Sequence, residues 1–215
     1  MYRVIKQGGI VVWIVSDATL NGSETGTSFK QALYFKEIGF NIFDTMIWNK
    51  QNASSIGSLN RYENVFEYMF VFSKGKPATT NIIKDKINKR FGEKQHGSIR
   101  QKNGETRKTS NYGKKVVEKF GRRHNVWNVY PCKSPKERLH PAPFPIQLAK
   151  DHIVSWSNEN DTILDCFMGS GTVGIACKEL NRNFVGIEID KTYFDIAKKR
   201  IENFESNQLS IFDFL

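Results

Sequence analysis

The stretch 162–190, TILDCFMGSGTVGIACKELNRNFVGIEID, decides the fold of this chain. It begins with a short apolar run that ends in Asp165, and a glycine-containing turn follows at 166–172. Apolar residues at helical spacing predict a helix over 173–180, and a second apolar run at 184–187 ends in Glu188. This order predicts one βαβ unit. Its loop lies at the carboxyl end of the first strand, where open α/β sheets bind their ligands.

The residues of this turn indicate what kind of ligand it holds. Gly169 and Gly171 let the backbone turn sharply, and they let a ligand approach without a Cβ atom in the way. A carboxylate at the end of the second strand, Glu188, suits the two hydroxyls of a ribose. We therefore predict that the unit holds a nucleoside.

Three interpretations of the turn are open at this point: a nucleoside site, a dinucleotide site and an ordinary turn. Gly169, Gly171 and Gly174 match the dinucleotide-binding pattern G-x-G-x-x-G, with Glu188 near the expected spacing. Asp165 argues against a nicotinamide dinucleotide, because it precedes the turn where it can meet a positively charged group. The short chain after Glu188 also leaves little room for the rest of a dinucleotide-binding sheet. The third interpretation is an ordinary α/β turn without a ligand.

The same residues resemble a known family. Asp165-x-Phe167-x-Gly169-Ser170-Gly171-Thr172, followed by Asn181-Arg182-x-Phe184-x-Gly186-Ile187-Glu188, resembles the cofactor motif of the amino-group DNA methyltransferases. These enzymes transfer a methyl group from S-adenosylmethionine to N6 of adenine or N4 of cytosine. The upstream segment HPAPFP, 140–145, resembles their second cofactor-pocket motif. Cys166 is a departure, because the family usually has proline there.

The resemblance covers nearly the whole chain and implies a fold and a cofactor. The fold is α/β: a Rossmann-like methyltransferase sheet, incomplete at its N-terminal side, with an inserted basic DNA-recognition segment. An ordinary turn histidine is the alternative role for His140. The residues that the resemblance assigns to S-adenosylmethionine are Asp165, Phe167, Gly169, Ser170, Gly171, Thr172, Glu188, His140, Pro141 and Phe144.

Composition limits the classes of function. The 215 residues suit one domain with an insertion, and the net charge of +10 favours a polyanionic partner. Three cysteines without a CxxC pair predict a reducing compartment, and four histidines without ligand spacing predict no metal site. No apolar run is long enough for a membrane span. We expect a cytoplasmic protein of a bacterium or phage.

The N-terminal third predicts further elements of the sheet. A continuous apolar run at 10–15 predicts a buried central strand, and strands are also predicted at 40–48 and 65–72. Ser28 and Gln31 predict a capping box for a helix that ends near Ile38. Aromatic residues alternate at 66, 68, 70 and 72, and we interpret them as core packing rather than a platform for stacked bases.

Basic residues concentrate in the middle of the chain. Residues 74–123 contain 16 Lys or Arg and 4 Asp or Glu, and they interrupt the α/β pattern before a short strand at 126–129. A solvated charged face is the alternative interpretation. We predict an insertion that contacts double-stranded DNA, where the resembled family has its target-recognition region. The predicted DNA-binding residues are Lys84, Lys86, Lys89, Arg90, Arg100, Gln101, Lys102, Asn103, Arg107, Lys108, Arg122 and Arg123. Candidates for reading bases are Arg100, Gln101, Asn103, Arg107 and Asn111.

The remaining chain completes the predicted organisation. A helix at 146–156 directs Ala149, Ile153 and Trp156 at the sheet, and another helix covers 192–204. The predicted segments are thus 1–72 of the catalytic half, the basic insertion 73–130, the cofactor-binding half 131–204 and a tail 205–215. In that tail, Gln208–Phe212 resembles the short peptide by which bacterial proteins bind the replication sliding clamp.

One motif of the resembled family does not occur in this sequence. In that family an Asp, Asn or Ser followed by Pro-Pro and an aromatic residue binds the target amine, but no two of the six prolines here are adjacent. In this order of motifs it should precede the strand at Ile10. We therefore expect a C-terminal portion of a methyltransferase, with no catalytic residue in this chain and no activity alone. A non-catalytic DNA-binding remnant, or a subunit completed by a partner, is the alternative.

Overall fold

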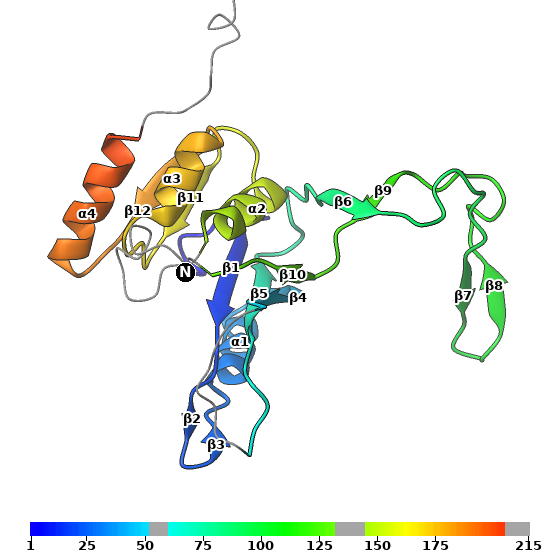
Figure 1. Cartoon of the computed structure of the whole chain (residues 1–215), viewed down its shortest axis with the longest axis horizontal. Coiled ribbons are helices and arrows are strands. Elements are labelled where there is room, and N and C mark those ends of the chain that lie inside the picture. Colours follow the sequence, from blue (N-terminus) through cyan, green and yellow to red (C-terminus); the bar gives the residue numbers. More distant parts are fainter. Residues whose placement is uncertain (52–59, 132–144, 205–215) are drawn as a thin grey trace, which may run out of the picture. The chain divides into compact units, whose positions relative to one another are not determined.

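The computed structural model describes residues 1–51, 60–131 and 145–204, and the chain divides into two compact units. Unit 1 comprises Met1–Asn81 and Asn125–Leu215, and unit 2 is Ile82–His124. Figure 1 shows the elements of both units in chain order. No helix of the described residues is long and apolar enough to cross a membrane.

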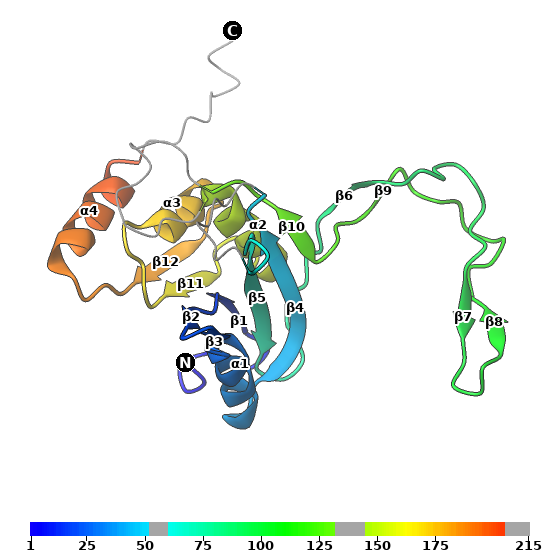
Figure 2. The same ribbon diagram turned by 60° about the horizontal axis from the view of Figure 1, so that its bottom comes forward.

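Unit 1 contains a four-stranded sheet of order β1-β5-β4-β10. Its strands are β1 (Ile10–Val15), β4 (Asn41–Asn49), β5 (Phe66–Ser73) and β10 (Val126–Asn128). β5 is antiparallel to both β1 and β4, while β10 runs parallel to β4 (Figure 2). The strands predicted at 40–48 and 65–72 are confirmed, each displaced by one residue.

The prediction that β1 is a buried central strand is wrong. Among the described residues, β5 is the only strand hydrogen-bonded to β1, so β1 lies at an edge of its sheet. Val11 is its one buried residue, and the other five are partly exposed. An apolar run shows that both faces of a strand suit burial. It does not show whether a second neighbouring strand is present.

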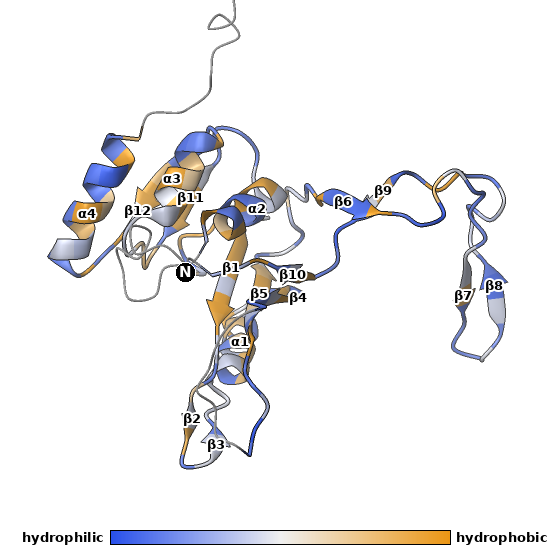
Figure 3. Cartoon of the chain, viewed as in Figure 1, coloured by the Kyte–Doolittle hydropathy of each residue, from blue (hydrophilic) through white to orange (hydrophobic). Residues whose placement is uncertain are grey.

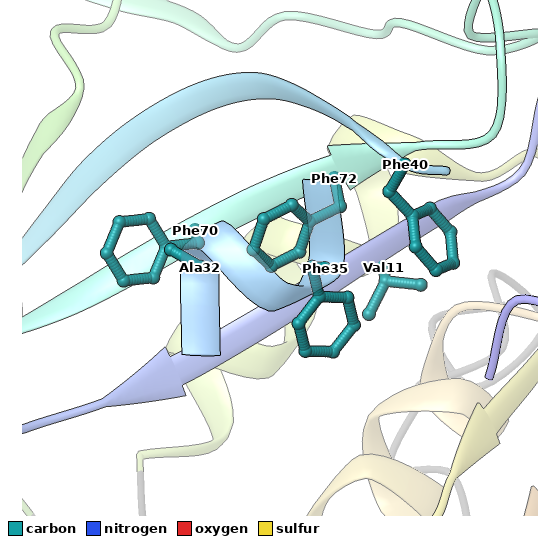
Figure 4. Close-up of a cluster of buried hydrophobic side chains, with 6 residues drawn as sticks. All are labelled: Val11, Ala32, Phe35, Phe40, Phe70 and Phe72. Atoms are coloured by element: carbon teal, nitrogen blue, oxygen red, sulfur yellow. The ribbon is translucent and has the colours of Figure 1, made fainter. Parts of the chain in front are cut away.

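Helix α1 (Thr27–Glu37) packs against this sheet through aromatic side chains. The Phe35 ring stacks on Phe72 with centroids 4.4 Å apart, and Phe72 is fully buried. Figure 4 shows these two rings with the rest of the cluster: Val11, Ala32, Phe40 and Phe70. The packing role predicted for the alternating aromatic residues is therefore confirmed for the two at the carboxyl end of β5.

The capping box predicted for α1 is wrong. The N-cap residue is Gly26, which has no side-chain cap. Ser28 instead donates its hydroxyl and its backbone N–H to Asp17, the latter at 3.1 Å, and Gln31 accepts a 2.8 Å hydrogen bond from the Trp13 indole. Asp17 lies between β1 and the small hairpin of β2 (Thr19–Leu20) and β3 (Ser23–Glu24). The Ser28 hydroxyl lowers the pKa of Asp17. Because Asp17 accepts the Ser28 N–H, a residue outside the helix supplies the side-chain acceptor at the N-terminus of α1.

The C-terminal half of unit 1 contains the predicted βαβ unit. Strands β11 (Thr162–Asp165) and β12 (Asn183–Gly186) pair in parallel and are joined by α3 (Thr172–Glu179). Helix α4 (Lys191–Glu202) follows, and Asp190 caps its N-terminus by accepting from two backbone N–H groups. Among the described residues this pair forms a sheet of its own, without hydrogen bonds to the four-stranded sheet.

Helix α2 (Ile146–Trp156) packs against both sheets of unit 1. Ala149 and Ile153 are buried, but they cluster with Ala176 and Cys177 of helix α3 rather than directly with a sheet as predicted, whereas Trp156 packs against the cluster of the four-stranded sheet. On the other side Leu148 joins a cluster with the four-stranded sheet, formed with Met46, Trp48, Met69, Val71 and Trp127. The helix therefore holds the βαβ unit and the first sheet within one unit.

Unit 2 is a two-stranded antiparallel ribbon without a core. Its strand pairs are β6 (Lys84–Ile87) with β9 (Phe120–Arg122), and β7 (Ser98–Arg100) with β8 (Thr106–Lys108). None of its residues is buried. Figure 3 shows mostly hydrophilic residues along it, in contrast to the apolar β1. The unit lies within the predicted insertion 73–130.

Candidate functional site: a glycine loop between β11 and α3

The loop after β11 is attached to the residues that follow β12. The backbone N–H of Ile187 donates to the Asp165 carbonyl at 2.9 Å, and the N–H of Met168 donates to the Ile187 carbonyl at 3.0 Å. Parallel pairing thus continues past the end of β12 and brings both strand ends to one edge. This is the location predicted from the sequence for a ligand-binding loop.

Glycines shape the loop for two different reasons. Gly169 and Gly171 have φ angles of 49° and 84°, in the left-handed region that glycine adopts without strain. Gly171 is the N-cap residue of α3. Gly174, the third glycine of the pattern, serves packing: a Cβ atom there would lie 2.3 Å from the Ile201 side chain on α4. Gly169 and Gly171 therefore form the turn, and Gly171 and Gly174 both lie close against α4.

Glu188 fixes the glycine turn from the neighbouring strand. Its Oε2 accepts a 2.9 Å hydrogen bond from the Gly169 N–H, and its Oε1 accepts one from the Asp190 N–H at 3.0 Å. Glu188 therefore ties the glycine turn to Asp190, the residue that caps α4.

Asp165 lies at the end of β11 in a largely desolvated position. Its Oδ1 accepts a 3.0 Å hydrogen bond from the Phe167 N–H. Burial raises the pKa of its carboxyl above the ordinary value, and the negative charge of Glu188 raises it further, against the lowering effect of the Phe167 hydrogen bond. Two carboxylates at one loop make a cation a favourable ligand. A nearby positive charge would stabilise the ionised form of the buried Asp165 and offset the repulsion from Glu188.

The other predicted residues of this loop have different surroundings. Phe167 is 73% exposed, and its ring lies edge-on to Trp13 of β1 with centroids 6.1 Å apart. Ser170 is buried, and its carbonyl accepts a hydrogen bond from the Arg200 guanidinium of α4. Thr172 is the first residue of α3. Of the remaining predicted cofactor residues, His140, Pro141 and Phe144 lie outside the described residues.

Sequence reasoning missed the contributions of Trp13 and Arg200 to this loop. Arg200 on α4 is 30 residues from Ser170 in the sequence, so no local pattern pairs the two. The guanidinium–carbonyl bond is a signal that only the folded chain contains. Trp13 was part of an apolar strand, and nothing in that run distinguishes a residue beside the loop from a core residue.

The twelve predicted DNA-binding residues all lie in unit 2, and the ten that are Lys or Arg fall into two groups. Lys84, Arg90 and Arg123 form ion pairs with Glu118, Glu93 and Asp85. For the other predicted cations of the unit, no ion pair is found among the described residues. Unit 2 has 14 Lys or Arg and 4 Asp or Glu, so it carries the entire net charge of +10 of the chain.

Two further expectations concern other sites. Among the described residues no group of three or more His, Cys, Asp or Glu side chains is arranged to hold a metal ion. The clamp-like segment Gln208–Phe212 lies outside the described residues.

Comparison with known proteins identifies the family. A family model described as DNA methylase, for N6 and N4 amino-methyltransferases, matches residues 1–199. The chain belongs to this DNA methylase family. The cofactor of the family is S-adenosylmethionine rather than a nicotinamide dinucleotide, and the fold is that of the methyltransferases resembled by the sequence.

Individual DNA methylases are similar over most of this chain. The orphan methyltransferase M.BamHII from Bacillus amyloliquefaciens is 49% identical over 212 residues, which are 95% of this chain and 78% of that protein. The type II methyltransferase M.Cfr9I from Citrobacter freundii is 28% identical over 86% of this chain, and the match spans 53% of its length. The solved complex of M1.HpyAVI with S-adenosylmethionine has a TM-score of 0.63 and 26% identity, and the match covers 94% of this chain and 78% of that one.

Proposed function

We propose that this chain is the cofactor- and DNA-binding portion of a DNA methyltransferase that modifies an exocyclic amine within a specific duplex sequence. One observation carries the proposal: Glu188 bonds to the Gly169 N–H while Asp165 lies desolvated at the same loop. We propose adenine N6 as the amine, because it is the more frequent target in the family. The compartment would be that of bacterial or phage DNA, the cytoplasm.

Named residues of the loop suit different parts of S-adenosylmethionine. When bound, this cofactor supplies an electrophilic methyl group on a sulfonium. The carboxylate of Glu188, just past the end of β12, suits the ribose hydroxyls. Asp165 suits the positively charged portion, and the exposed ring of Phe167 offers a flat apolar surface to the adenine. The left-handed backbone at Gly169 and Gly171 gives the loop the sharp turn that follows Asp165.

Methyl transfer demands more than residues 1–215 contain. An exocyclic amine is a poor nucleophile, so the flipped base must be held by hydrogen-bond acceptors and aligned with the methyl donor. The Pro-Pro-aromatic motif that does this in the family is absent from the printed sequence. We propose that residues 1–215 bind the cofactor and DNA but do not transfer methyl groups alone.

The two sheets of unit 1 indicate where a completing segment would bind. β1 is bonded only to β5, and β11 only to β12, among the described residues. The two strands are nevertheless close neighbours: before them, Lys6 and Asp161 form an ion pair of 3.1 Å. Within β1, Trp13 contacts Phe167, which follows β11. β1 carries apolar side chains on both faces although it lies at an edge of its sheet, and we propose that one further strand, bonded to both, completes the sheet and the active site.

A non-catalytic role is the second candidate. The basic ribbon of unit 2 is complete in itself, with all of its residues described and most of its cations without an ion pair. It would bind DNA even if no completing strand were supplied. In that case the chain would be a DNA-binding remnant, or a subunit that a partner completes.

Calorimetric titration with S-adenosylmethionine tests the cofactor site. Wild type should bind, and Asp165→Ala should weaken binding about a hundredfold, the order expected for losing the partner of a charged ligand group. Asp195→Asn, which removes a carboxylate on the exposed side of α4, is the matched control and should bind as wild type does. Equal binding by wild type and Asp165→Ala would refute the assignment.

A transfer assay tests the missing strand. The chain is incubated with labelled S-adenosylmethionine and bacterial DNA, alone and after co-expression with the part of M.BamHII that lies outside the match. Label should enter DNA only in the second case. Label in DNA from the chain alone would contradict the proposal, and label in neither case would favour the non-catalytic role.

A further inference from the structure

The β7–β8 hairpin at one end of the ribbon has two chemically different faces. Residues paired directly across an antiparallel ladder lie on the same face, and successive residues alternate. The register pairs Ser98 with Lys108 and Arg100 with Thr106, so these four share one face. Ile99 pairs with Arg107 on the other face. We call the first the polar face: Ser98, Arg100, Thr106 and Lys108. Figure 1 shows the hairpin.

The turn of the hairpin uses one of the predicted base readers for its own structure. The Asn103 side chain donates to a Glu105 carboxylate oxygen at 2.9 Å, and its carbonyl accepts from the Glu105 N–H at 3.1 Å. The Gln101 N–H donates to the Glu105 carbonyl at 2.7 Å, which leaves a three-residue loop at 102–104, and Gly104 has the φ angle of 87° that the last loop position requires. Both ends of the Asn103 amide are thus occupied within the turn. Asn103 therefore positions the hairpin and ranks below Arg100 as a reader.

The polar face combines exposure with positive charge. All eleven residues from 98 to 108 are exposed, and none of the four on this face is acidic. At the base of the hairpin, the Lys108 ammonium lies 4.5 Å from the centroid of the Tyr112 ring, which also contacts His96. The aromatic pair thus restrains Lys108, while Arg100 and Thr106 lie nearer the turn. No ion pair is found for Arg100 or Arg107 in unit 2, all of which is described.

These observations support a specific mode of DNA recognition by the β7–β8 hairpin. This inference rests on the proposed function. We infer that the β7–β8 hairpin enters the major groove of duplex DNA with its polar face toward the base edges, and that Arg100 reads one guanine. A two-stranded ribbon fits the major groove, and arginine binds guanine O6 and N7 with two hydrogen bonds. Arg107 lies on the opposite face, so it contributes charge toward phosphates without reading a base.

Arg100 and Arg107 form a matched pair for an experiment, since each substitution to alanine removes one exposed positive charge from the same hairpin. The full chain, with S-adenosylmethionine present, is mixed with a pool of duplexes that contain a random window, and the retained duplexes are sequenced. Wild type should enrich a site. Arg100→Ala should lose preference at one G·C pair about 10- to 100-fold. Arg107→Ala should keep every base preference and weaken retention of all sequences alike.

The outcomes separate this inference from the proposed function. Unchanged base preference in Arg100→Ala, or equal loss of preference in both variants, would overturn the inference while leaving DNA binding intact. Retention of the pool by wild type without enrichment of any site would also overturn it, because a hairpin that reads bases must select sequences. Failure of wild type to retain any duplex would overturn both the inference and the proposed function. Asn103→Ala provides a further check: it should weaken retention generally through the turn, with no preference lost at a single base pair.

Discussion

Unit 1 and unit 2 differ in the burial of their side chains and in their net charge. Unit 1 has three clusters of buried apolar side chains, whereas unit 2 has no buried residue. Unit 2 carries the net charge of +10, and the rest of the chain is neutral in sum. A two-stranded ribbon is marginally stable in water. On the proposed function, burial would order the unit that holds the cofactor, and a bound polyanion would help to order the charged ribbon.

Removal of the ribbon should give the largest effect and separate the two units functionally. Because the Arg123 N–H donates to the Ile83 carbonyl at 2.9 Å, the ends of the ribbon lie together, and Gly-Ser-Gly can replace 84–122. Affinity for duplex DNA at 50 mM salt should fall about a thousandfold or more, as expected when about six phosphate contacts are lost. Affinity for S-adenosylmethionine should stay the same. Fluorescence anisotropy and calorimetry measure the two, and retained DNA affinity would show that unit 1 supplies the DNA surface.

Truncation of apolar side chains should affect the two units unequally. Phe72 is fully buried and stacked on Phe35, so Phe72→Ala should lower the free energy of unfolding by about 3–5 kcal/mol. Ile99 is 60% exposed, and Ile99→Ala should change the free energy of unfolding by less than about 0.5 kcal/mol. Urea unfolding followed by circular dichroism measures both. Similar effects at the two positions would mean that the ribbon has a core of its own.

Acid should destabilise unit 1 through a buried histidine. His152 lies beside Met69 with its Nε2 3.2 Å from the sulfur, and its Nδ1 accepts from the Trp156 indole. Burial lowers the pKa of His152 from 6.5 to about 3. The unfolded chain therefore takes up a proton as the pH falls through 6.5, while the folded chain does not. Stability is fully present above this pH and is lost progressively toward pH 3.

The size of this effect follows from the linkage between protonation and folding. Between pH 7 and pH 5 the free energy of unfolding should fall by about 2 kcal/mol. His152→Gln should remove this part of the pH dependence whatever its effect on absolute stability, and His96→Gln in unit 2 is the matched control. Thermal unfolding at a series of pH values measures the slope. An unchanged slope in His152→Gln would assign the acid sensitivity to other groups.

Single ion pairs should give the smallest effects, and again less in the ribbon. Lys84 and Glu118 of unit 2 are 57% and 69% exposed, and Lys84→Ala should cost less than about 0.5 kcal/mol. Lys50 and Glu67 of unit 1 are 24% and 22% exposed, and Lys50→Ala should cost about 1–2 kcal/mol. Melting temperatures of the two variants provide the comparison. A larger loss for Lys84→Ala would indicate that ion pairs, rather than a bound partner, hold the ribbon together.

The sequence by itself determined the elements that depend on neighbouring residues. Apolar spacing predicts β11, α3 and β12 because side chains repeat every two or 3.6 residues along a strand or a helix. The glycine turn is predictable because left-handed backbone angles favour glycine, as at Gly171. The basic segment is predictable because charge is a property of composition. The family motif at Asp165 and Glu188 made the cofactor expectation specific.

Only the tertiary structure decided which residues meet across the chain. Three features depend on residues that are not neighbours in the sequence. They are the edge position of β1, the bond from α1 to Asp17 and the bond from Arg200 to the glycine loop. The strand register likewise decided that Arg100 and Arg107 lie on opposite faces. Local propensity cannot supply these pairings, because it describes which conformation a segment favours and not which partner satisfies it. Partners are chosen by packing and hydrogen bonding in the folded chain, where a strand with two apolar faces still needs a neighbour to cover its edge.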